Sequence, residues 1–227
     1  MIKVSQFLIA CAFIFLSPAA QAKLEVVATT PDFGSIAAEI GRGHASVTTL
    51  AKPTEDPHFV DAKPSFIVKL NRADAVVEGG AELEIGWLPA LLDQSRNPRL
   101  ALGAPGRISC SQEISLLQIP ASLDRSRGDI HAAGNPHFMT DPLNAKIVAE
   151  HIANAFCQLD PKSCDGYRTN LKKFTAALES KSAEPFAPPS ANCETITPRA
   201  SSFFSITESM ETAISGWKGF GFWNESG

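Results

Sequence analysis

Residues 24–41 read LEVVATTPDFGSIAAEIG, and this stretch decides the fold class. Its first six residues form a short β-rich run. Pro31-Asp32 then opens an apolar pattern with helical spacing, which stops at Gly41. The stretch therefore predicts a strand followed closely by a helix.

The same alternation continues along the next part of the chain. Two further strands are expected at 46–50 and 74–78, and a fourth strand lies either at 100–102 or around Ile108. One helix is expected to begin at Pro64 and another to cover 83–92. Strands and helices that alternate with short connections are typical of an α/β fold. We therefore expect a parallel sheet that is flanked by helices on both faces.

Two further helices are predicted within residues 142–183. Asp141-Pro142 combines a capping residue with proline in the first turn, and apolar residues then recur at helical spacing as far as Leu159. Asp160-Pro161 repeats the start signal. A second apolar stripe follows, formed by Tyr167, Leu171, Phe174 and Leu178.

The amino terminus has the pattern of a secretory signal peptide. Lys3 precedes an apolar run over residues 7–16, and Ala20-Gln21-Ala22 carries small residues at a cleavage site. We expect residues 1–22 to be removed and the rest to be released into the periplasm. Cys11 lies in a sequence that resembles a lipidation box, but the apolar run continues beyond it, so we expect no lipid anchor.

Composition is that of an ordinary soluble globular chain. The 227 residues carry a formal net charge of −4, with 44% hydrophobic and 19% charged residues. A mildly acidic chain lacks the basic surface that a phosphate backbone requires, so we expect no nucleic-acid partner.

Export would permit disulfides among the four cysteines that follow the signal peptide, which are Cys110, Cys157, Cys164 and Cys193. Four cysteines allow three connectivities. Cys157 and Cys164 flank the predicted corner at Asp160-Pro161, so they form either a local bridge or a free buried pair. None of these cysteines has the C-x-x-C spacing that is typical of a structural zinc cluster or of a thioredoxin-like redox site.

A repeated Pro-His-Phe motif is the clearest functional signal. It occurs in residues 56–59 (DPHF) and 135–138 (NPHF). Proline before each histidine places His58 and His137 on loops, and loops at strand ends are where open α/β sheets bind ligands. Two imidazoles would supply half of a tetrahedral metal site, whereas isolated histidines are more often structural or surface residues.

Four segments together resemble the solute-binding proteins of zinc and manganese ABC importers. They are VVATT at 26–30, PTEDPHFVDAKPS at 53–65, ADAVV at 73–77 and GNPHFMTDP at 134–142. The resemblance covers about residues 24–183. It implies that His58 and His137 bind Zn²⁺, or else Mn²⁺, and that the protein delivers the metal to a membrane permease as a monomer without catalysis.

The resemblance also implies two lobes joined by a long helix, with the metal held between them. On this basis residues 23–141 form the amino-terminal lobe, and 142–183 contain the start of the linking helix. Residues 184–227 depart from the pattern, because no Leu or Val follows Leu178 and no histidine follows His151. We expect most of the second lobe to be missing, with its ligands unidentified, through a frameshift or premature stop after about residue 190.

Several alternatives remain at this point. His131 is either an auxiliary zinc-capturing residue or an ordinary loop histidine, and His44 and His151 are expected to be structural or exposed. The chain could instead be an exported metal-dependent hydrolase with a water in an open coordination position, although it has no H-E-x-x-H or G-x-S-x-G motif. It could also be a truncated remnant without function.

Overall fold

The computed structural model describes residues 22–120 and 131–182 and contains a four-stranded parallel sheet. Its strands are β1 (Leu24–Ala28), β2 (Ala45–Thr49), β3 (Ala75–Glu78) and β4 (Arg107–Ser109). The order across the sheet is β2-β1-β3-β4, and each neighbouring pair is parallel. The predicted parallel sheet is confirmed, and its fourth strand is the one that contains Ile108.

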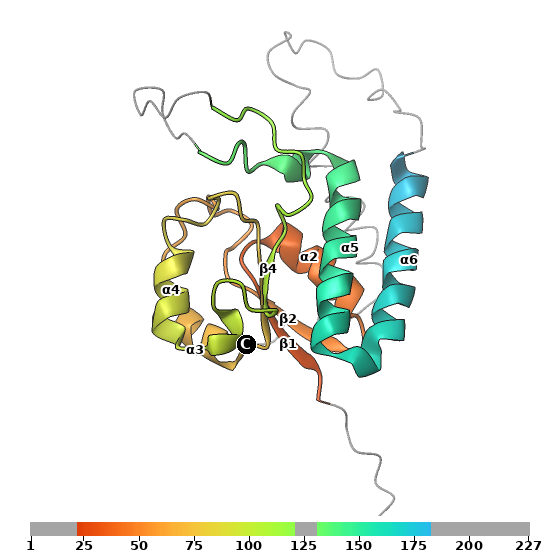
Figure 1. The fold of residues 1–227 in the computed structure, drawn as a ribbon, viewed down its shortest axis with the longest axis horizontal. Helices are drawn as coiled ribbons and strands as arrows, with labels where there is room; N and C mark the ends of the chain where they lie inside the picture. Colours follow the sequence, from red (N-terminus) through yellow and green to blue (C-terminus); the bar gives the residue numbers. More distant parts are fainter. Residues whose placement is uncertain (1–21, 121–130, 183–227) are drawn as a thin grey trace, which may run out of the picture.

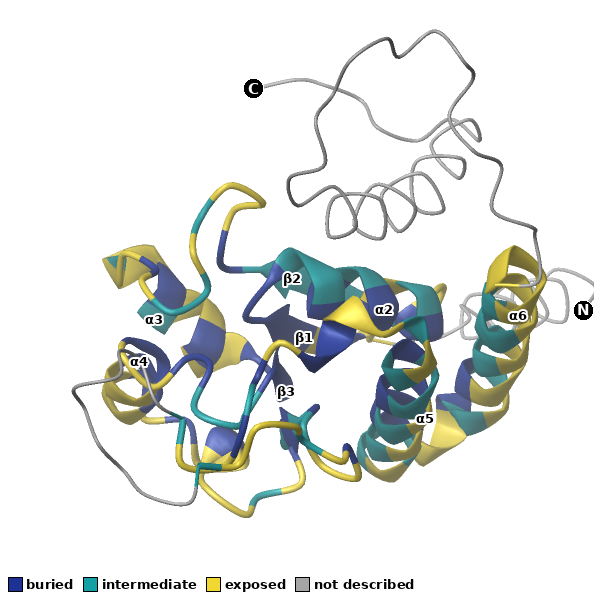
Figure 2. Cartoon of the chain, turned by 90° about the horizontal axis from the view of Figure 1, so that it is seen from above, coloured by how far each residue is buried: buried dark blue, intermediate teal, exposed yellow. Residues whose placement is uncertain are grey.

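Helices cover both faces of the sheet, as predicted (Figure 1). On one face lie α2 (Pro31–Gly41), α5 (Pro142–Leu159) and α6 (Cys164–Ser182). On the other lie α3 (Pro64–Arg72) and α4 (Leu88–Ser95). Seen from above, β3 is buried throughout and β1 is mostly buried, whereas edge strand β2 is half-buried and exposed residues lie on helix surfaces and loops (Figure 2).

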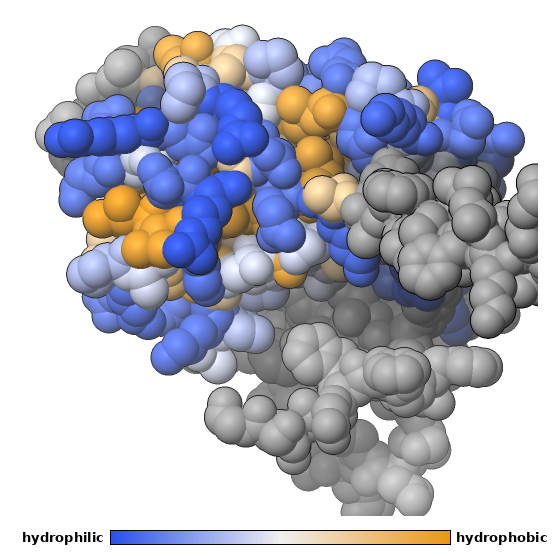
Figure 3. All heavy atoms as spheres, turned by 90° about the horizontal axis from the view of Figure 1, so that it is seen from below, coloured by the Kyte–Doolittle hydropathy of each residue, from blue (hydrophilic) through white to orange (hydrophobic). Residues whose placement is uncertain are grey.

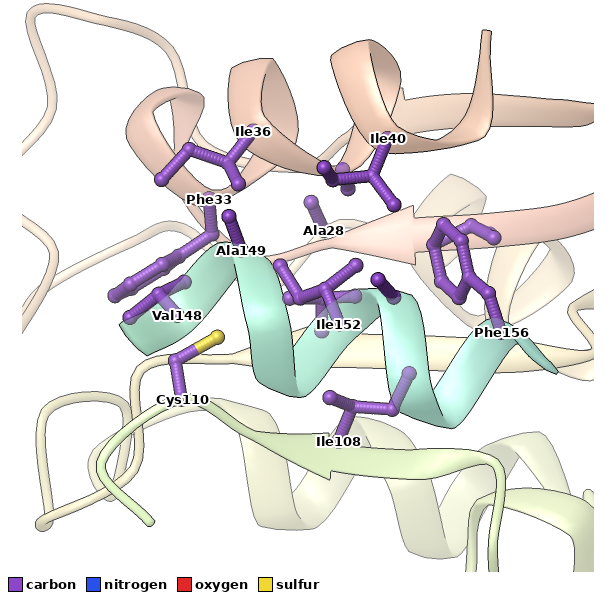
Figure 4. Close-up of a cluster of buried hydrophobic side chains, with 14 of the residues drawn as sticks. Ala28, Phe33, Ile36, Ile40, Ile108, Cys110, Val148, Ala149, Ile152 and Phe156 are labelled. Atoms are coloured by element: carbon purple, nitrogen blue, oxygen red, sulfur yellow. The ribbon is translucent and has the colours of Figure 1, made fainter. Parts of the chain in front are cut away.

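The larger core lies between the sheet and α2 and α5 (Figure 4). Its fully buried side chains include Phe33 and Ile40 from α2, Ile152 and Phe156 from α5, and Ile108 from β4. Burying an apolar side chain of this size contributes roughly 1.5–3 kcal/mol. This core therefore fixes α5 against the sheet, and with α5 the loop that precedes it.

A disulfide joins the end of α5 to the start of α6. The S–S distance between Cys157 and Cys164 is 2.09 Å, which confirms the local bridge. Cys110 is a buried free thiol, and burial raises its pKa well above the ordinary value. Cys193 lies outside the described residues.

One sequence-based boundary on the second face was wrong. A helix was expected over 83–92, but α4 begins at Leu88, because residues 81–87 form turns in which Ala81 and Glu82 have φ of 51° and 68°. Residues 98–100 form a 3-10 helix, so the structure decides between the two alternatives for the fourth strand in favour of Ile108. Proline and an asparagine cap, whose side chain accepts a hydrogen bond from the backbone N–H of Arg99, account for that short helix.

The remaining segment predictions are not tested by the fold. The predicted tail and all of the predicted signal peptide except Ala22 lie outside the described residues. The domain boundaries drawn from the sequence therefore stay predictions. Within the residues described, no helix is long and apolar enough to cross a membrane.

Candidate metal centre

The loops that follow β2, β3 and β4 gather at one edge of the sheet, on its upper side in Figure 1. All strands are parallel, so their carboxyl ends share this edge. The edge beyond the carboxyl ends is the usual ligand site of open α/β sheets. It carries both Pro-His-Phe motifs, one after β2 and one after β4.

His58 and His137 meet at this edge although 79 residues separate them. Their Nε2 atoms are 3.2 Å apart, and their rings are nearly perpendicular, with centroids 5.1 Å apart. Two imidazoles on a tetrahedral zinc ion, with Zn–N bonds of about 2.0–2.1 Å, place their nitrogens about 3.3 Å apart. The pair thus has the spacing of adjacent metal ligands, and in the absence of metal one ring can donate a hydrogen bond to the other.

Both histidine loops are fixed by the same local turn. The backbone N–H of His58 donates to Oδ1 of Asp56 at 2.9 Å, and that of His137 donates to Oδ1 of Asn135 at 2.9 Å. Asp and Asn favour such turns because their short side chains reach the backbone two residues ahead. The repeated Asp/Asn-Pro-His sequence was the visible signal for this geometry.

The first loop is supported by the segment before α4. The indole N–H of Trp87 donates to the carbonyl oxygen of Pro57 at 2.8 Å. Gly86 lies so close that a Cβ there would be 3.0 Å from the carbonyl oxygen of His58. Sequence reasoning missed this support, because a hydrogen bond across 30 residues leaves no local pattern.

The second loop is anchored in the core. Phe138 is 7% exposed and packs on Phe33, with ring centroids 6.1 Å apart. The side chain of Asn144 on α5 donates to the carbonyl oxygen of Phe138 at 2.8 Å, and the hydroxyl of Thr140 donates to that of His137 at 3.0 Å. The position of His137 therefore follows from the position of α5.

His131 lies beside the pair. Its ring stacks on that of His58, with centroids 5.0 Å apart and an interplanar angle of 21°. Its Nδ1 is 4.0 Å from Oε2 of Glu82, which also accepts a hydrogen bond from the backbone N–H of Ala132 at 2.8 Å. In the described part of the chain, however, no group of three or more His, Cys, Asp or Glu side chains is arranged to hold a metal ion.

The surroundings of His137 favour its neutral form. Partial burial lowers the pKa of His137, and the neighbouring His58 and His131 lower it further, while Asp56 acts in the opposite direction. A neutral imidazole has the free lone pair that a metal requires. The other two histidines lie elsewhere: His44 packs edge-on against Tyr167 with centroids 5.7 Å apart, and His151 is on α5.

A buried carboxylate lies behind the loops and was missed by the sequence reasoning. Glu84 is 4% exposed and accepts hydrogen bonds from the Thr29 hydroxyl at 2.6 Å and from the backbone N–H groups of Gly79 and Gly80 at 2.7 and 3.2 Å. Burial raises its pKa to about 7, aided by the nearby charge of Glu78 and opposed by the hydrogen bonds. It ties together the carboxyl ends of β1 and β3. The only sign of this buried carboxyl group in the sequence was that an acidic residue, Glu84, lies among apolar residues after Gly79-Gly80.

Comparison with protein families gives one match that covers most of the described chain. The family described as zinc-uptake complex component A, periplasmic (ZnuA), matches residues 26–185. This range includes both histidine loops and both long helices.

Curated relatives show the same similarity at low identity. The chain is 25% identical over 175 residues to the manganese ABC transporter substrate-binding lipoprotein PsaA of Streptococcus mitis, and 25% identical to the iron ABC transporter substrate-binding lipoprotein MtsA of Streptococcus pyogenes. Each alignment covers 76% of this chain and 53% of the relative. The chain thus spans about half the length of the curated relatives it matches.

Solved structures agree with the fold. A ZnuA deletion mutant with zinc bound matches with a TM-score of 0.59 and 27% identity, covering 70% of this chain and 56% of that one. A manganese-bound periplasmic metal-binding protein from Candidatus Liberibacter asiaticus matches with a TM-score of 0.57 and 23% identity, covering 69% of this chain and 53% of that one. Because its sequence identity is only 23%, the second match supports the fold and nothing more.

Proposed function

The chain belongs to the family of zinc-uptake complex component A, and from this we propose that it is the extracytoplasmic metal-binding component of an ABC importer. In this role it captures a divalent metal ion with His58 and His137 and passes it to a membrane permease. The relatives named above are substrate-binding proteins of metal transporters, which supports transport rather than catalysis.

The observation that carries the proposal is the meeting of the two Pro-His-Phe loops. The 3.2 Å separation of the two Nε2 atoms is the separation of adjacent tetrahedral ligands. The lowered pKa of His137 keeps this ring available to a metal ion near neutral pH. The ring of His131 stacks on that of His58, and this contact supports our proposal that His131 is an auxiliary residue that captures zinc.

Zinc is the metal that this donor set favours. Imidazole suits zinc, whereas manganese prefers carboxylate, carbonyl and water oxygens. Two nearby carboxylates each accept one backbone hydrogen bond, Asp56 from the N–H of His58 and Glu82 from that of Ala132. The ligands that we propose are the two imidazoles, whose Nε2 atoms are 3.2 Å apart.

A second candidate is a metal-dependent hydrolase in which the same two histidines hold a zinc-bound water. Two imidazoles leave open positions for such a water. The sequence has no H-E-x-x-H motif that would place a general base beside the metal-binding histidines. Chelator-sensitive hydrolysis of ester or peptide substrates is the result that would favour this candidate.

Thermal unfolding with zinc and with chelator tests the proposed function. A ligand that binds only the folded state raises its apparent stability, by about 2.7 kcal/mol at a hundredfold excess over Kd. We expect zinc to raise the transition temperature of the parent chain, and His58→Ala and His137→Ala to abolish that rise. His151→Ala is the matched control, because it removes a histidine from α5 outside the site. A zinc response that persists in both site variants would overturn the proposal.

A further inference from the structure

The segment at residues 79–87 contacts the chain on both sides of the histidine pair. A Cβ on Gly86 would lie 3.0 Å from the carbonyl oxygen of His58, so the two backbones are in close contact. Earlier in the same segment, Oε2 of Glu82 accepts a hydrogen bond at 2.8 Å from the backbone N–H of Ala132, which follows His131. One short segment therefore touches both the first histidine loop and the chain that leads to the second.

Glu84 ties the middle of this segment to the sheet. Its carboxyl group accepts hydrogen bonds from the hydroxyl of Thr29, just after β1, at 2.6 Å and from the backbone N–H of Gly79, just after β3, at 2.7 Å. Its backbone carbonyl oxygen accepts a hydrogen bond at 3.2 Å from the N–H of Trp87, and the indole of Trp87 supports the first histidine loop. Glu84 therefore connects the carboxyl edge of the sheet to the support of that loop.

The support of the second histidine loop meets Glu84 at Gly79. A Cβ on Gly79 would lie 3.2 Å from Oε1 of Glu84 and 2.9 Å from Cε2 of Phe33, so the carboxyl group and the phenyl ring both border this glycine. The ring of Phe33 packs on that of Phe138, with centroids 6.1 Å apart, and Phe138 directly follows His137. The surroundings of Glu84 thus reach the supports of both loops.

Building on the proposed function, we infer that Glu84 is a positioning residue for the histidine pair and that metal capture by the pair releases a proton from its carboxyl group. Hydrogen bonds to an ionised carboxylate are roughly twice as strong as those to a neutral group. Ionised Glu84 therefore holds segment 79–87 more firmly than protonated Glu84 does. A metal ion that requires both loops in place favours the ionised form, and by linkage the ion and the proton compete.

The groups packed around the carboxyl group leave it a proton to release near neutral pH. Burial raises the pKa of Glu84 to about 7, and the charge of Glu78 on β3 raises it further, while the hydrogen bonds act in the opposite direction. Glu78 is itself paired with Arg107 on β4, with Oε1 and Nε 2.9 Å apart. Asp32 at the start of α2 and the thiol of Cys110 after β4 belong to the same cluster, because Glu84 and Asp32 both raise the pKa of Cys110.

Calorimetric titration with zinc, in buffers of different ionisation enthalpy, counts the protons that binding releases. At about pH 7 we expect the parent chain to release up to about half a proton more than Glu84→Gln, because about half of the Glu84 carboxyl groups are protonated there. From about pH 6 to about pH 8, zinc affinity should rise by up to about tenfold more in the parent than in the variant. Protonation of the histidines contributes to both proteins, so the difference reports Glu84.

Two further variants separate positioning from a general loss of charge or stability. Hydrophilic residues make up much of the molecular surface, as the view from below shows (Figure 3). Glu150 is an exposed acid on α5, so Glu150→Gln is the matched control and should keep the pH dependence of the parent. Thr29→Val keeps the size of the side chain but removes the hydroxyl that favours ionised Glu84, so the excess proton release should extend to higher pH.

The outcomes distinguish this inference from the proposed function. If zinc binding requires His58 and His137 but releases the same number of protons from the parent and from Glu84→Gln, the inference is overturned and the importer role stays in place. A proton release that Thr29→Val leaves at the same pH also overturns the inference. Zinc binding that is unchanged in both His58→Ala and His137→Ala overturns the proposed function, and the inference with it.

Discussion

The two Pro-His-Phe loops have nearly the same sequence, but their phenylalanines lie in different surroundings. Phe138 is 7% exposed and packs on Phe33 in the core, whereas Phe59 is 72% exposed. The turn before each histidine is the same in both loops. Local sequence therefore sets the direction of the imidazole, and long-range packing decides how firmly the loop is held.

The largest expected difference between the loops is in the cost of removing each phenylalanine. Phe138→Ala empties a core position, and such truncations cost about 3–5 kcal/mol. Phe59→Ala removes an exposed side chain and should change the free energy of unfolding by less than about 0.5 kcal/mol. Urea unfolding of both variants measures this. Equal losses would show that the first loop is anchored as firmly as the second.

The tie that Glu84 makes between the carboxyl ends of β1 and β3 should depend on pH. The pKa of Glu84 is raised to about 7 in the folded chain from an ordinary value of 4.5, so the folded state binds the proton more tightly. Protonated Glu84 therefore adds up to roughly 3 kcal/mol to the free energy of unfolding. This contribution is complete below about pH 4.5 and is lost as the pH rises through about 7.

Unfolding free energies of the parent and Glu84→Gln, compared at about pH 4.5 and about pH 8, isolate this contribution from that of other groups. We expect the parent to lose more stability than the variant over this range. A parent and a variant with parallel pH profiles would contradict the raised pKa.

A smaller effect is expected when the tie between Trp87 and the first loop is removed. Trp87→Phe deletes the indole donor and leaves the carbonyl oxygen of Pro57 without its partner, which costs roughly 1–3 kcal/mol. Zinc affinity should fall as well, because the His58 loop loses a support. Isothermal titration of zinc and urea unfolding give the two values. Loss of stability with unchanged affinity would show that the turn alone positions His58.

The smallest effects should come from the two turns themselves. Asp56→Ala and Asn135→Ala each remove one side-chain acceptor from a backbone N–H, and we expect each to cost about 1 kcal/mol. Zinc titration should show a greater loss of affinity for Asp56→Ala, because the first loop lacks a phenylalanine anchor. Asp56→Asn keeps the acceptor and removes the charge, so it is the control. A greater loss for Asn135→Ala would reverse the ranking of the two loops.

Much of the fold could be predicted because its signals are local. The β-rich run that begins at Leu24, the prolines at the starts of α2, α3 and α5 and the apolar stripe of α5 all depend on neighbouring residues. The segment 81–87 could not be predicted in the same way. Leu83, Ile85 and Trp87 lead directly into α4, but the chain forms turns there. Ala81 and Glu82 have positive φ, and the Glu84 carboxyl accepts hydrogen bonds from the backbone of Gly79 and Gly80.

For the candidate site, the sequence could predict which residues take part but not how they are arranged. The repeated motif identified His58 and His137 as candidates, and the parallel sheet placed their loops at one edge. The sequence could not give the 3.2 Å approach of their Nε2 atoms or the stacking of His131 on His58, because both depend on contacts across more than 70 residues. Metal ligation by these residues stays a prediction.

The all-parallel order of the strands has a consequence for how the chain folds. In the part of the chain that the structure describes, every neighbouring strand pair is parallel and is joined through a crossover connection, so these strands form no hairpin that could nucleate the sheet. The strands β1 and β3 pair across about fifty residues. Topologies with few local pairings fold slowly, because loop-closure entropy is lost before the contacts form.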